Sequence, residues 1–138
     1  MMSLAQVTDR LAVSDVLTRY ATAMDSRDWE LLGSCFTEDA RLDYDTSGEF
    51  GRKDFVAHCA EGLAKMKATQ HCVTNHVIAL DGDHARATSY VIAQHVREND
   101  ATFTLGGTYH DELVRCGADW RIASRRFVTS WKAGTLHG

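Results

Sequence analysis

The first third of the chain carries apolar residues at the three- and four-residue spacing of amphipathic helices. Between Asp9 and Met24 these positions are Val13, Val16, Leu17, Tyr20, Ala21 and Met24. The segment 25–28 (Asp-Ser-Arg-Asp) breaks this spacing, and Asp28 is suited to cap a second helix. Its apolar positions are Trp29, Leu32, Cys35 and Phe36. We therefore expect one helix over 9–24, another from residue 29, and Asp25 at the end of the first.

A short strand and a third helix are expected next. Residues 40–44 alternate weakly between apolar and polar, and the turn-rich segment 45–48 (Asp-Thr-Ser-Gly) follows them. From 52 to 65 the helical spacing returns, with Phe55, Val56, Cys59, Leu63 and Met66 on the apolar face. The pattern predicts a strand and hairpin followed by a helix over 52–65.

The second half of the chain has the pattern of β-strands. Four segments, 71–80, 85–97, 103–116 and 120–131, are separated by turn residues such as Asp81-Gly82-Asp83 and Gly117-Ala118-Asp119. Three helices followed by long strands predict an α+β fold, in which a curved antiparallel sheet wraps around the helices as a cone. No repeat or linker is visible, so we expect one domain over 1–138 with a small-molecule pocket in its concave mouth.

Composition narrows the classes of function. The chain has 138 residues, 25% charged and 44% hydrophobic, and a net charge of −4, which is typical of a globular domain and gives no basic surface for nucleic acid. No apolar run has the length of a membrane span and no leader pattern is visible, so we expect a cytoplasmic protein. The four cysteines form no C-x-x-C pair and the seven histidines no H-x-x-H or H-E-x-x-H pair, so we expect no metal.

Two residues together suggest acid–base chemistry. In the strand 71–80, alternation places His71 and His76 on opposite faces, so one of them faces the interior. Such a histidine is ordinarily structural, and an aspartate at a helix end such as Asp25 ordinarily caps backbone amides. A carboxylate bonded to one imidazole nitrogen, however, fixes the tautomer and leaves the other nitrogen as a general base. The sequence pattern does not establish that Asp25 and a histidine meet.

An ordered set of short motifs resembles a known family. The set comprises Arg19-Tyr20, Ala23, Asp25, Asp28-Trp29, Phe36, Asp39-Ala40, His71, Thr74-Asn75, Gly106-Gly107-Thr108-Tyr109 and Trp120-Arg121-Ile122. It resembles the SnoaL-like branch of the nuclear transport factor 2-like superfamily over nearly the whole chain. This resemblance implies the cone-shaped α+β barrel, also called cystatin-like.

Within that branch the chain is most similar to scytalone dehydratase, bile-acid 7α-dehydratase and hexachlorocyclohexane dehydrochlorinase, which are lyases without a cofactor. The resemblance implies that Asp25 and His71 form a catalytic pair. It places Tyr20 where the dehydrochlorinase has a lysine. The dehydratases have a tyrosine at this place, and its phenol hydrogen-bonds the substrate or the bound water. It aligns a pocket arginine with Arg125, although a strand bulge would bring Arg126 there instead. His95 and His110 are further candidates because their strands should line the cone, and the two histidines that scytalone dehydratase uses favour His95.

Two functions follow as alternatives. The first is a cofactor-independent lyase or isomerase acting on a small apolar cyclic molecule, with Trp29, Tyr44 and Phe55 among the residues that shape the pocket. Its reaction stays open among dehydration, dehydrohalogenation, isomerisation and cyclisation. The second is a non-catalytic module that binds a ligand or supports assembly, similar to the small subunit of ring-hydroxylating dioxygenases. In either case we expect a homo-oligomer, a dimer or trimer, that covers an outer sheet face carrying Val91 and Phe103.

Overall fold

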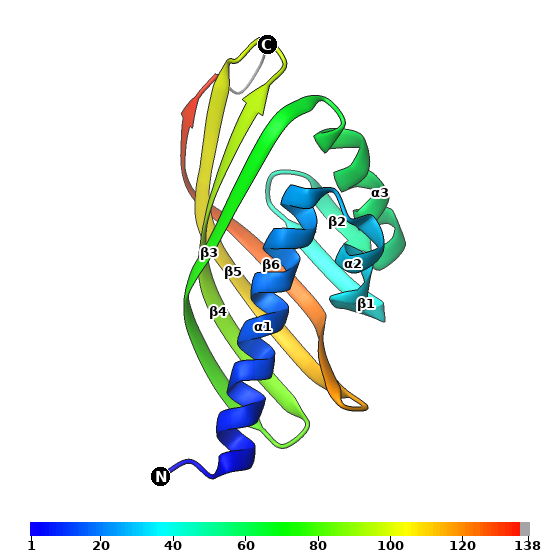
Figure 1. Cartoon of the computed structure of the whole chain (residues 1–138), viewed down its shortest axis with the longest axis vertical. Helices are drawn as coiled ribbons and strands as arrows, with labels where there is room; N and C mark the ends of the chain where they lie inside the picture. Colours follow the sequence, from blue (N-terminus) through cyan, green and yellow to red (C-terminus); the bar gives the residue numbers. More distant parts are fainter. Residues whose placement is uncertain (136–138) are drawn as a thin grey trace.

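One long, curved sheet runs the length of the molecule, and the helices lie against its concave side (Figure 1). The computed structural model describes residues 1–135. Its helices are α1 (Leu4–Ser26), α2 (Trp29–Ser34) and α3 (Arg52–Leu63). Its strands are β1 (Phe36–Tyr44), β2 (Gly48–Gly51), β3 (Met66–Asp81), β4 (His84–Arg97), β5 (Thr102–Cys116) and β6 (Asp119–Gly134).

The strand order within this sheet is β2-β1-β6-β5-β4-β3. The pairing of β1 with β6 is parallel, and all other neighbours pair antiparallel. The four long strands form one consecutive antiparallel ribbon, and β1 with β2 extends it beside α3. The expected α+β cone is therefore confirmed.

Helix α1 is longer than its apolar pattern indicated. It begins after Ser3, whose hydroxyl accepts from the Gln6 backbone N–H while the Gln6 side chain accepts from the Ser3 backbone N–H, a capping box. It ends at Ser26, and the capping residue Arg27 adopts the left-handed conformation with φ 61°. Within residues 1–135, no helix has both the length and the apolar character needed to cross a bilayer.

The second helix is shorter than expected. Asp28 caps it by accepting from the Leu31 N–H, but it ends at Ser34, and Phe36 begins β1 instead of continuing the helix. Phe36 is paired with Ile122 of β6, and both side chains are fully buried. Assigning Phe36 to the helix was wrong because its burial is equally compatible with a helix and with a strand.

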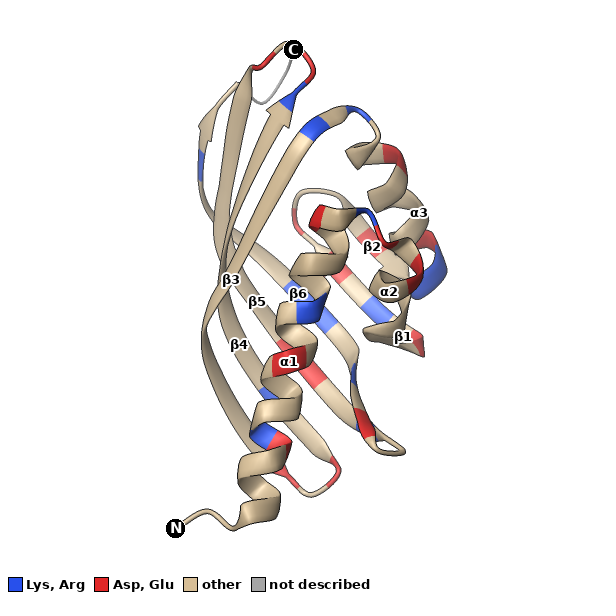
Figure 2. Ribbon diagram, viewed as in Figure 1, with Lys and Arg blue, Asp and Glu red and all other residues tan. Residues whose placement is uncertain are grey.

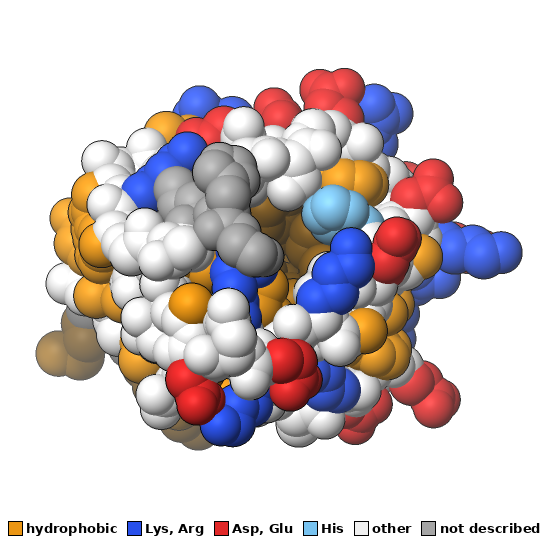
Figure 3. All heavy atoms as spheres, turned by 90° about the horizontal axis from the view of Figure 1, so that it is seen from above, with side chains coloured by type: hydrophobic (Ala, Val, Ile, Leu, Met, Phe, Trp, Pro, Cys, Tyr) orange, Lys and Arg blue, Asp and Glu red, His pale blue; other side chains and the backbone are white. Residues whose placement is uncertain are grey.

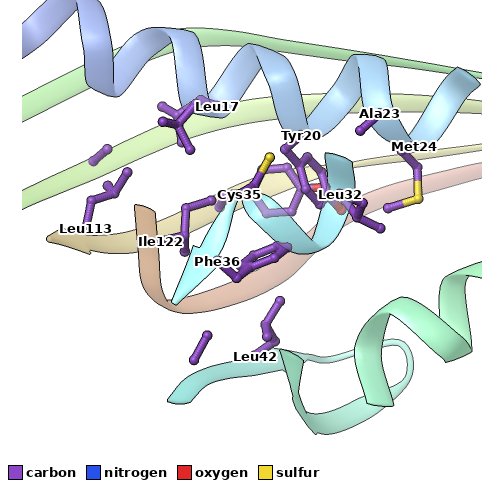
Figure 4. Packing of buried hydrophobic residues seen from close by; sticks show 14 of the residues in the cluster. Leu17, Tyr20, Ala23, Met24, Leu32, Cys35, Phe36, Leu42, Leu113 and Ile122 are labelled. Atoms are coloured by element: carbon purple, nitrogen blue, oxygen red, sulfur yellow. The ribbon is translucent and has the colours of Figure 1, made fainter. Parts of the chain in front are cut away.

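The core fills the space between α1 and the inner face of the sheet (Figure 4). Leu17 and Tyr20 of α1 meet Phe36 of β1 and Ile122 of β6 there, and all four are at most 1% exposed. Tyr20 lies edge-on to Phe36, with ring centroids 6.1 Å apart. This packing fixes the last turns of α1, and with them Asp25, against the sheet.

A bulge in β3 changes which residues face inward. The register with β4 shifts between Thr74 and Val77, and Asn75 has φ 54°. Before the bulge His71 is on the partly buried side, whereas after it His76 and Ile78 are, and Val77 is 68% exposed. The expectation that only one of His71 and His76 faces inward was wrong, because the extra residue reverses the alternation.

The outer face of the sheet carries different residues from those expected. Val91 is 2% exposed and borders the inner cavity, and Phe103 stacks on His95, which borders the same cavity. Neither therefore contributes to the outer face. The alternate residues Tyr90 and Ile92 do, with half or more of their surface exposed, because they are one position out of phase with Val91.

Candidate active site

A cavity of about 180 Å³ lies between α1, α3 and the sheet. Aromatic side chains form much of its wall: Tyr20, Tyr44, Phe55, Tyr109 and Phe127. Three histidines also border it: His58 of α3, His71 of β3 and His95 of β4. Seen from the end of the molecule near the C-terminus, the surface is hollowed, with hydrophobic side chains inside and a histidine at the edge (Figure 3). The cavity is thus apolar with a few polar groups, as small-molecule sites usually are.

Asp25 and His71 are directly hydrogen-bonded. Nδ1 of His71 is 2.7 Å from Oδ1 of Asp25, and the backbone N–H of His71 donates to Oδ2, also at 2.7 Å. Thr69 donates its hydroxyl to Oδ1 at 3.0 Å. Because an ionised carboxylate only accepts, Nδ1 of His71 carries a proton, and in the neutral ring the lone pair is then on Nε2. The pair therefore has the arrangement of an oriented general base.

The surroundings of Asp25 favour its ionised form. Burial by itself would raise the pKa of this carboxyl group, but the hydrogen bonds from the ring and backbone of His71 and from Thr69 outweigh it and hold the pKa below the usual value. Asp25 therefore stays negatively charged in neutral solution, where it can stabilise a protonated His71.

His95 lies beside His71 and stays neutral. The two ring centroids are 5.9 Å apart, and His95 stacks on Phe103 at 4.1 Å with nearly parallel rings. Burial, and then the neighbouring His71, lower the pKa of His95 to about 4. At neutral pH His95 is therefore an uncharged hydrogen-bonding group at the cavity wall.

Three tyrosine hydroxyls meet at another part of the wall. Tyr20 and Tyr44 are hydrogen-bonded at 2.8 Å, and Tyr109 donates to Tyr20 at 3.3 Å. Burial raises the pKa of all three, so they stay neutral phenols. Two hydrogen bonds among three hydroxyls use two protons, so one O–H is left to donate to another acceptor. The cluster is suited to bind an oxygen atom of a ligand.

Arg125 lies behind the tyrosines and does not border the cavity. Its guanidinium makes two hydrogen bonds to Asp111, at 2.8 and 2.9 Å, and both side chains are fully buried. Its Cζ lies 4.2 Å from the centre of the Tyr20 ring and 3.8 Å from that of Tyr109. Arg126 is exposed on the outer face. Arg125 is therefore the inward-facing one of the two candidate arginines, but it contacts the rings of the tyrosines and not the cavity itself.

The remaining candidates divide between the cavity and other places. Tyr44 and Phe55 border the cavity and lie 4.9 Å apart between ring centroids. Trp29 of α2 is partly buried and packs against the core, but it does not border the cavity. His110 is paired with Arg126 and faces outward with it, so it is not a pocket residue. Within residues 1–135 no group of three His, Cys, Asp or Glu side chains is arranged to hold a metal ion.

The sequence analysis missed several residues in and around the candidate site. Asp111 was not singled out, although it lies two residues after Tyr109 and so on the same face of β5. Thr69 precedes the segment assigned to the strand, whereas β3 in fact begins at Met66. His58 lies on the cavity side of α3, and its spacing from Phe55 would have indicated a shared helix face.

The fold and these residues agree with a family match. The sequence matches the SnoaL-like domain family over residues 5–126, and the chain belongs to this family. It is similar to protein Rv2910c of Mycobacterium tuberculosis, with 31% identity over 129 residues that cover 91% of this chain and 88% of that protein. It is also similar to the terrestric acid biosynthesis cluster protein E of Penicillium crustosum, with 32% identity over 137 residues that cover 93% and 87%.

Solved structures of similar shape include enzymes. A candidate aromatic ring hydroxylase from Novosphingobium aromaticivorans is 28% identical, with a TM-score of 0.87 over 94% of this chain and 95% of that one. A candidate scytalone dehydratase from the same species has a TM-score of 0.90 at 21% identity, over 99% and 94%. A hexachlorocyclohexane dehydrochlorinase, LinA type 2, has a TM-score of 0.85 at 17% identity, over 96% and 93%. The last two likenesses concern the fold alone.

Proposed function

We propose that this protein is a cofactor-independent lyase of the dehydratase kind, or a related isomerase, that acts on a small, largely apolar cyclic molecule. The hydrogen bond between Asp25 and His71 at the wall of an apolar cavity carries this proposal. A candidate scytalone dehydratase and a dehydrochlorinase share this fold, so the fold is able to carry lyase chemistry.

The chemistry follows from the protonation states. Nε2 of His71 removes a proton from a carbon atom beside an activating group, and the negative charge of Asp25 stabilises the imidazolium that forms. The electron pair of the broken C–H bond forms the new double bond as the neighbouring C–O bond breaks. The leaving hydroxide takes the proton back from His71 and departs as water, so the protein returns to its starting state without a redox step.

The tyrosine cluster and His95 have the supporting role. The free phenol proton of Tyr20 or Tyr44 donates to an oxygen atom on the substrate where negative charge develops. The neutral ring of His95 offers a further hydrogen bond close to His71. Arg125 acts on the substrate only through the tyrosines, because its positive charge lies against the Tyr20 and Tyr109 rings.

The size of the cavity suggests the size of the substrate. An engineered apolar cavity of about 150 Å³ holds one benzene molecule, and the cavity here is about 180 Å³. A substrate with one ring and a few substituents suits this volume. The main alternative is a module that binds such a molecule without converting it, and the oriented pair Asp25–His71 is the feature that favours catalysis.

The test is a screen of hydroxylated and halogenated monocyclic compounds with the wild type and three variants. We expect His71→Ala and Asp25→Asn to lose nearly all turnover, because the base or its orienting charge is gone. Tyr20→Phe should reduce kcat by about tenfold to a hundredfold, since it removes one hydrogen bond to developing charge. His110→Ala, on the outer face, is the control.

Activity that survives dialysis against a chelator agrees with the proposal. Binding that is equal in wild type and His71→Ala, with no turnover in either, would establish the binding module instead.

We further propose that the outer face of the sheet packs against a second copy of this chain. Four apolar side chains are 45–68% exposed there: Val77, Tyr90, Ile92 and Trp131. The strand segments 68–80, 87–96 and 102–110 contain no Lys, Arg, Asp or Glu, so β3, β4 and β5 are uncharged in this half of the sheet (Figure 2). Large exposed apolar areas on a folded protein mark contact sites.

The charges on the other half of the same outer face favour a second copy of this chain as the partner. It borders a shallow hollow in which the exposed acidic and basic side chains are equal in number: Arg41, Arg86, Arg126, Asp43, Glu49 and Glu112. Such a surface can face itself about a two-fold axis without net repulsion. Four neighbouring strands, each presenting about four outward-facing side chains, cover a flat area of roughly 20 by 27 Å. The accessible surface of these side chains is larger than the flat area, so the area available approaches that of a standard interface.

Light scattering after size exclusion tests this second proposal. The wild type should behave as a dimer at micromolar concentration, and Ile92→Asp should be monomeric because it places a charge in the apolar half. Leu11→Asp, which changes an exposed leucine of α1, should remain dimeric. A monomeric wild type, or a dimer that Ile92→Asp leaves intact, would contradict the assignment of this face.

A further inference from the structure

Arg27 has a backbone conformation that does not favour arginine. It follows α1 with φ 61° and ψ 30°, the left-handed region. Its backbone N–H satisfies the helix end by donating to the carbonyls of Ala23 and Met24. Glycine adopts this conformation without strain and is the usual residue at such a position. The backbone therefore gives no reason for an arginine here.

The side chain of Arg27 links the end of α1 to the start of β3. Its Nη1 donates to the backbone carbonyl of Asp25 at 3.3 Å and to Oγ1 of Thr69 at 3.2 Å. Its Nη2 donates to the carbonyl of Met66 at 3.4 Å. These contacts join segments about forty residues apart in sequence at the point where Asp25 meets β3.

The chemistry of the donors fixes the direction of every hydrogen bond in this group. A guanidinium only donates, so the Thr69 hydroxyl accepts from Arg27. The single hydroxyl proton of Thr69 is then available to Asp25, whose Oδ1 lies 3.0 Å away. Oδ1 therefore accepts from Thr69 and from His71 Nδ1, and Oδ2 accepts from the His71 backbone.

We infer that Arg27 and Thr69 are positioning residues for the Asp25–His71 pair: Arg27 orients the Thr69 hydroxyl, and this hydroxyl donates to the Asp25 carboxylate and keeps it aimed at Nδ1 of His71. Neither residue borders the cavity, so both act through Asp25. The ionisable groups placed against Asp25 are His71 on β3 and Arg27 in the loop after α1. The kinetic part of this inference rests on the proposed function, whereas the effect on the carboxylate does not.

The first measurement is the titration of the Asp25 carboxyl carbon by NMR in the full-length protein. In Thr69→Val the midpoint should rise by roughly one pH unit, because the carboxylate loses one donor. Thr69→Ser should keep the wild-type midpoint, since serine restores the hydroxyl. Thr102→Val, a like change at an exposed position at the start of β5, is the matched control and should leave the midpoint unchanged.

Arg27→Gly separates positioning from support of the fold. Glycine relieves the left-handed backbone, so the melting temperature should not fall greatly, while the Asp25 midpoint should rise because the Thr69 hydroxyl is no longer oriented. A merely structural clamp would lower the melting temperature and leave the titration unchanged. If Arg27→Gly does not fold, the Thr69 variants still decide whether the hydroxyl matters.

Kinetics provide the second measurement. On a substrate found in the screen, Thr69→Val should lower kcat by about tenfold and change KM by less than about twofold, because the defect lies in the base and not in binding. An Asp25 midpoint that is the same in wild type, Thr69→Val and Arg27→Gly overturns the inference. Shifted midpoints in a protein that converts no compound would support the positioning role and contradict the proposed function.

Discussion

Acidification should destabilise this protein through one buried histidine. His95 is 8% exposed and stacks on Phe103, and its pKa is lowered to about 4 by burial and by His71. In the unfolded chain the same ring has an ordinary pKa of about 6.5. Because the unfolded state binds the proton more readily, His95 favours the folded state above pH 6.5, and this stability is lost as the pH falls toward 4.

The size of the effect follows from the two values. A difference of about 2.5 pKa units corresponds to about 3 kcal/mol over the whole range, and about 2 kcal/mol of it is lost between pH 8 and pH 5. This is a large part of the 5–15 kcal/mol that typically separates folded from unfolded states. In His95→Phe the stack on Phe103 is kept and the titrating group is gone.

Urea unfolding at pH 8 and at pH 5 measures the difference. The free energy of unfolding of the wild type should fall by about 2 kcal/mol more than that of His95→Phe. His110→Phe removes a histidine from the outer face and should remain as acid-sensitive as the wild type, which controls for composition. If His95→Phe loses as much stability on acidification as the wild type, the burial argument for His95 is wrong.

Two further predictions concern the core, and urea unfolding measures both. Leu17→Ala should lower the free energy of unfolding by about 2–5 kcal/mol because Leu17 is fully buried, whereas Leu11→Ala, on an exposed part of the same helix, should change it by less than about 0.5 kcal/mol. Asp111→Leu should lower it by about 3–5 kcal/mol because Arg125 is left as an unpaired buried cation, and adding Arg125→Met should restore most of the loss.

The long strands show how much of the fold local chemistry specifies. The turn glycines Gly82 and Gly117 have φ 60° and 63°, and they end strands where the sequence indicated. The segment expected at 103–116 is found at Thr102–Cys116. Alternation and turn residues act over a few neighbours, so they can be recognised without the rest of the chain.

Errors arose where a local pattern had two structural solutions. The extra residue at Asn75 reverses the alternation of β3. Val91 was expected on the outer face of the sheet but lies on the inner face, because the phase of the alternation in β4 differs by one residue. Phe36 is buried in a strand although its spacing also suited a helix. In each case the pairing of distant strands decided between the solutions, because register depends on the partner strand and not on the segment itself.

For this protein the sequence by itself determined the α+β class and the succession of helices and strands, because these depend on periodicity and turn residues, whereas the resemblance to the SnoaL-like family made Asp25 and His71 the candidate pair. Only the tertiary structure decided that Asp25 and His71 meet across 46 residues, that Asp111 pairs with Arg125 behind the tyrosines, and that a cavity of about 180 Å³ remains. These features depend on how α1 packs into the curved sheet, and that packing arises from contacts between segments far apart in the chain.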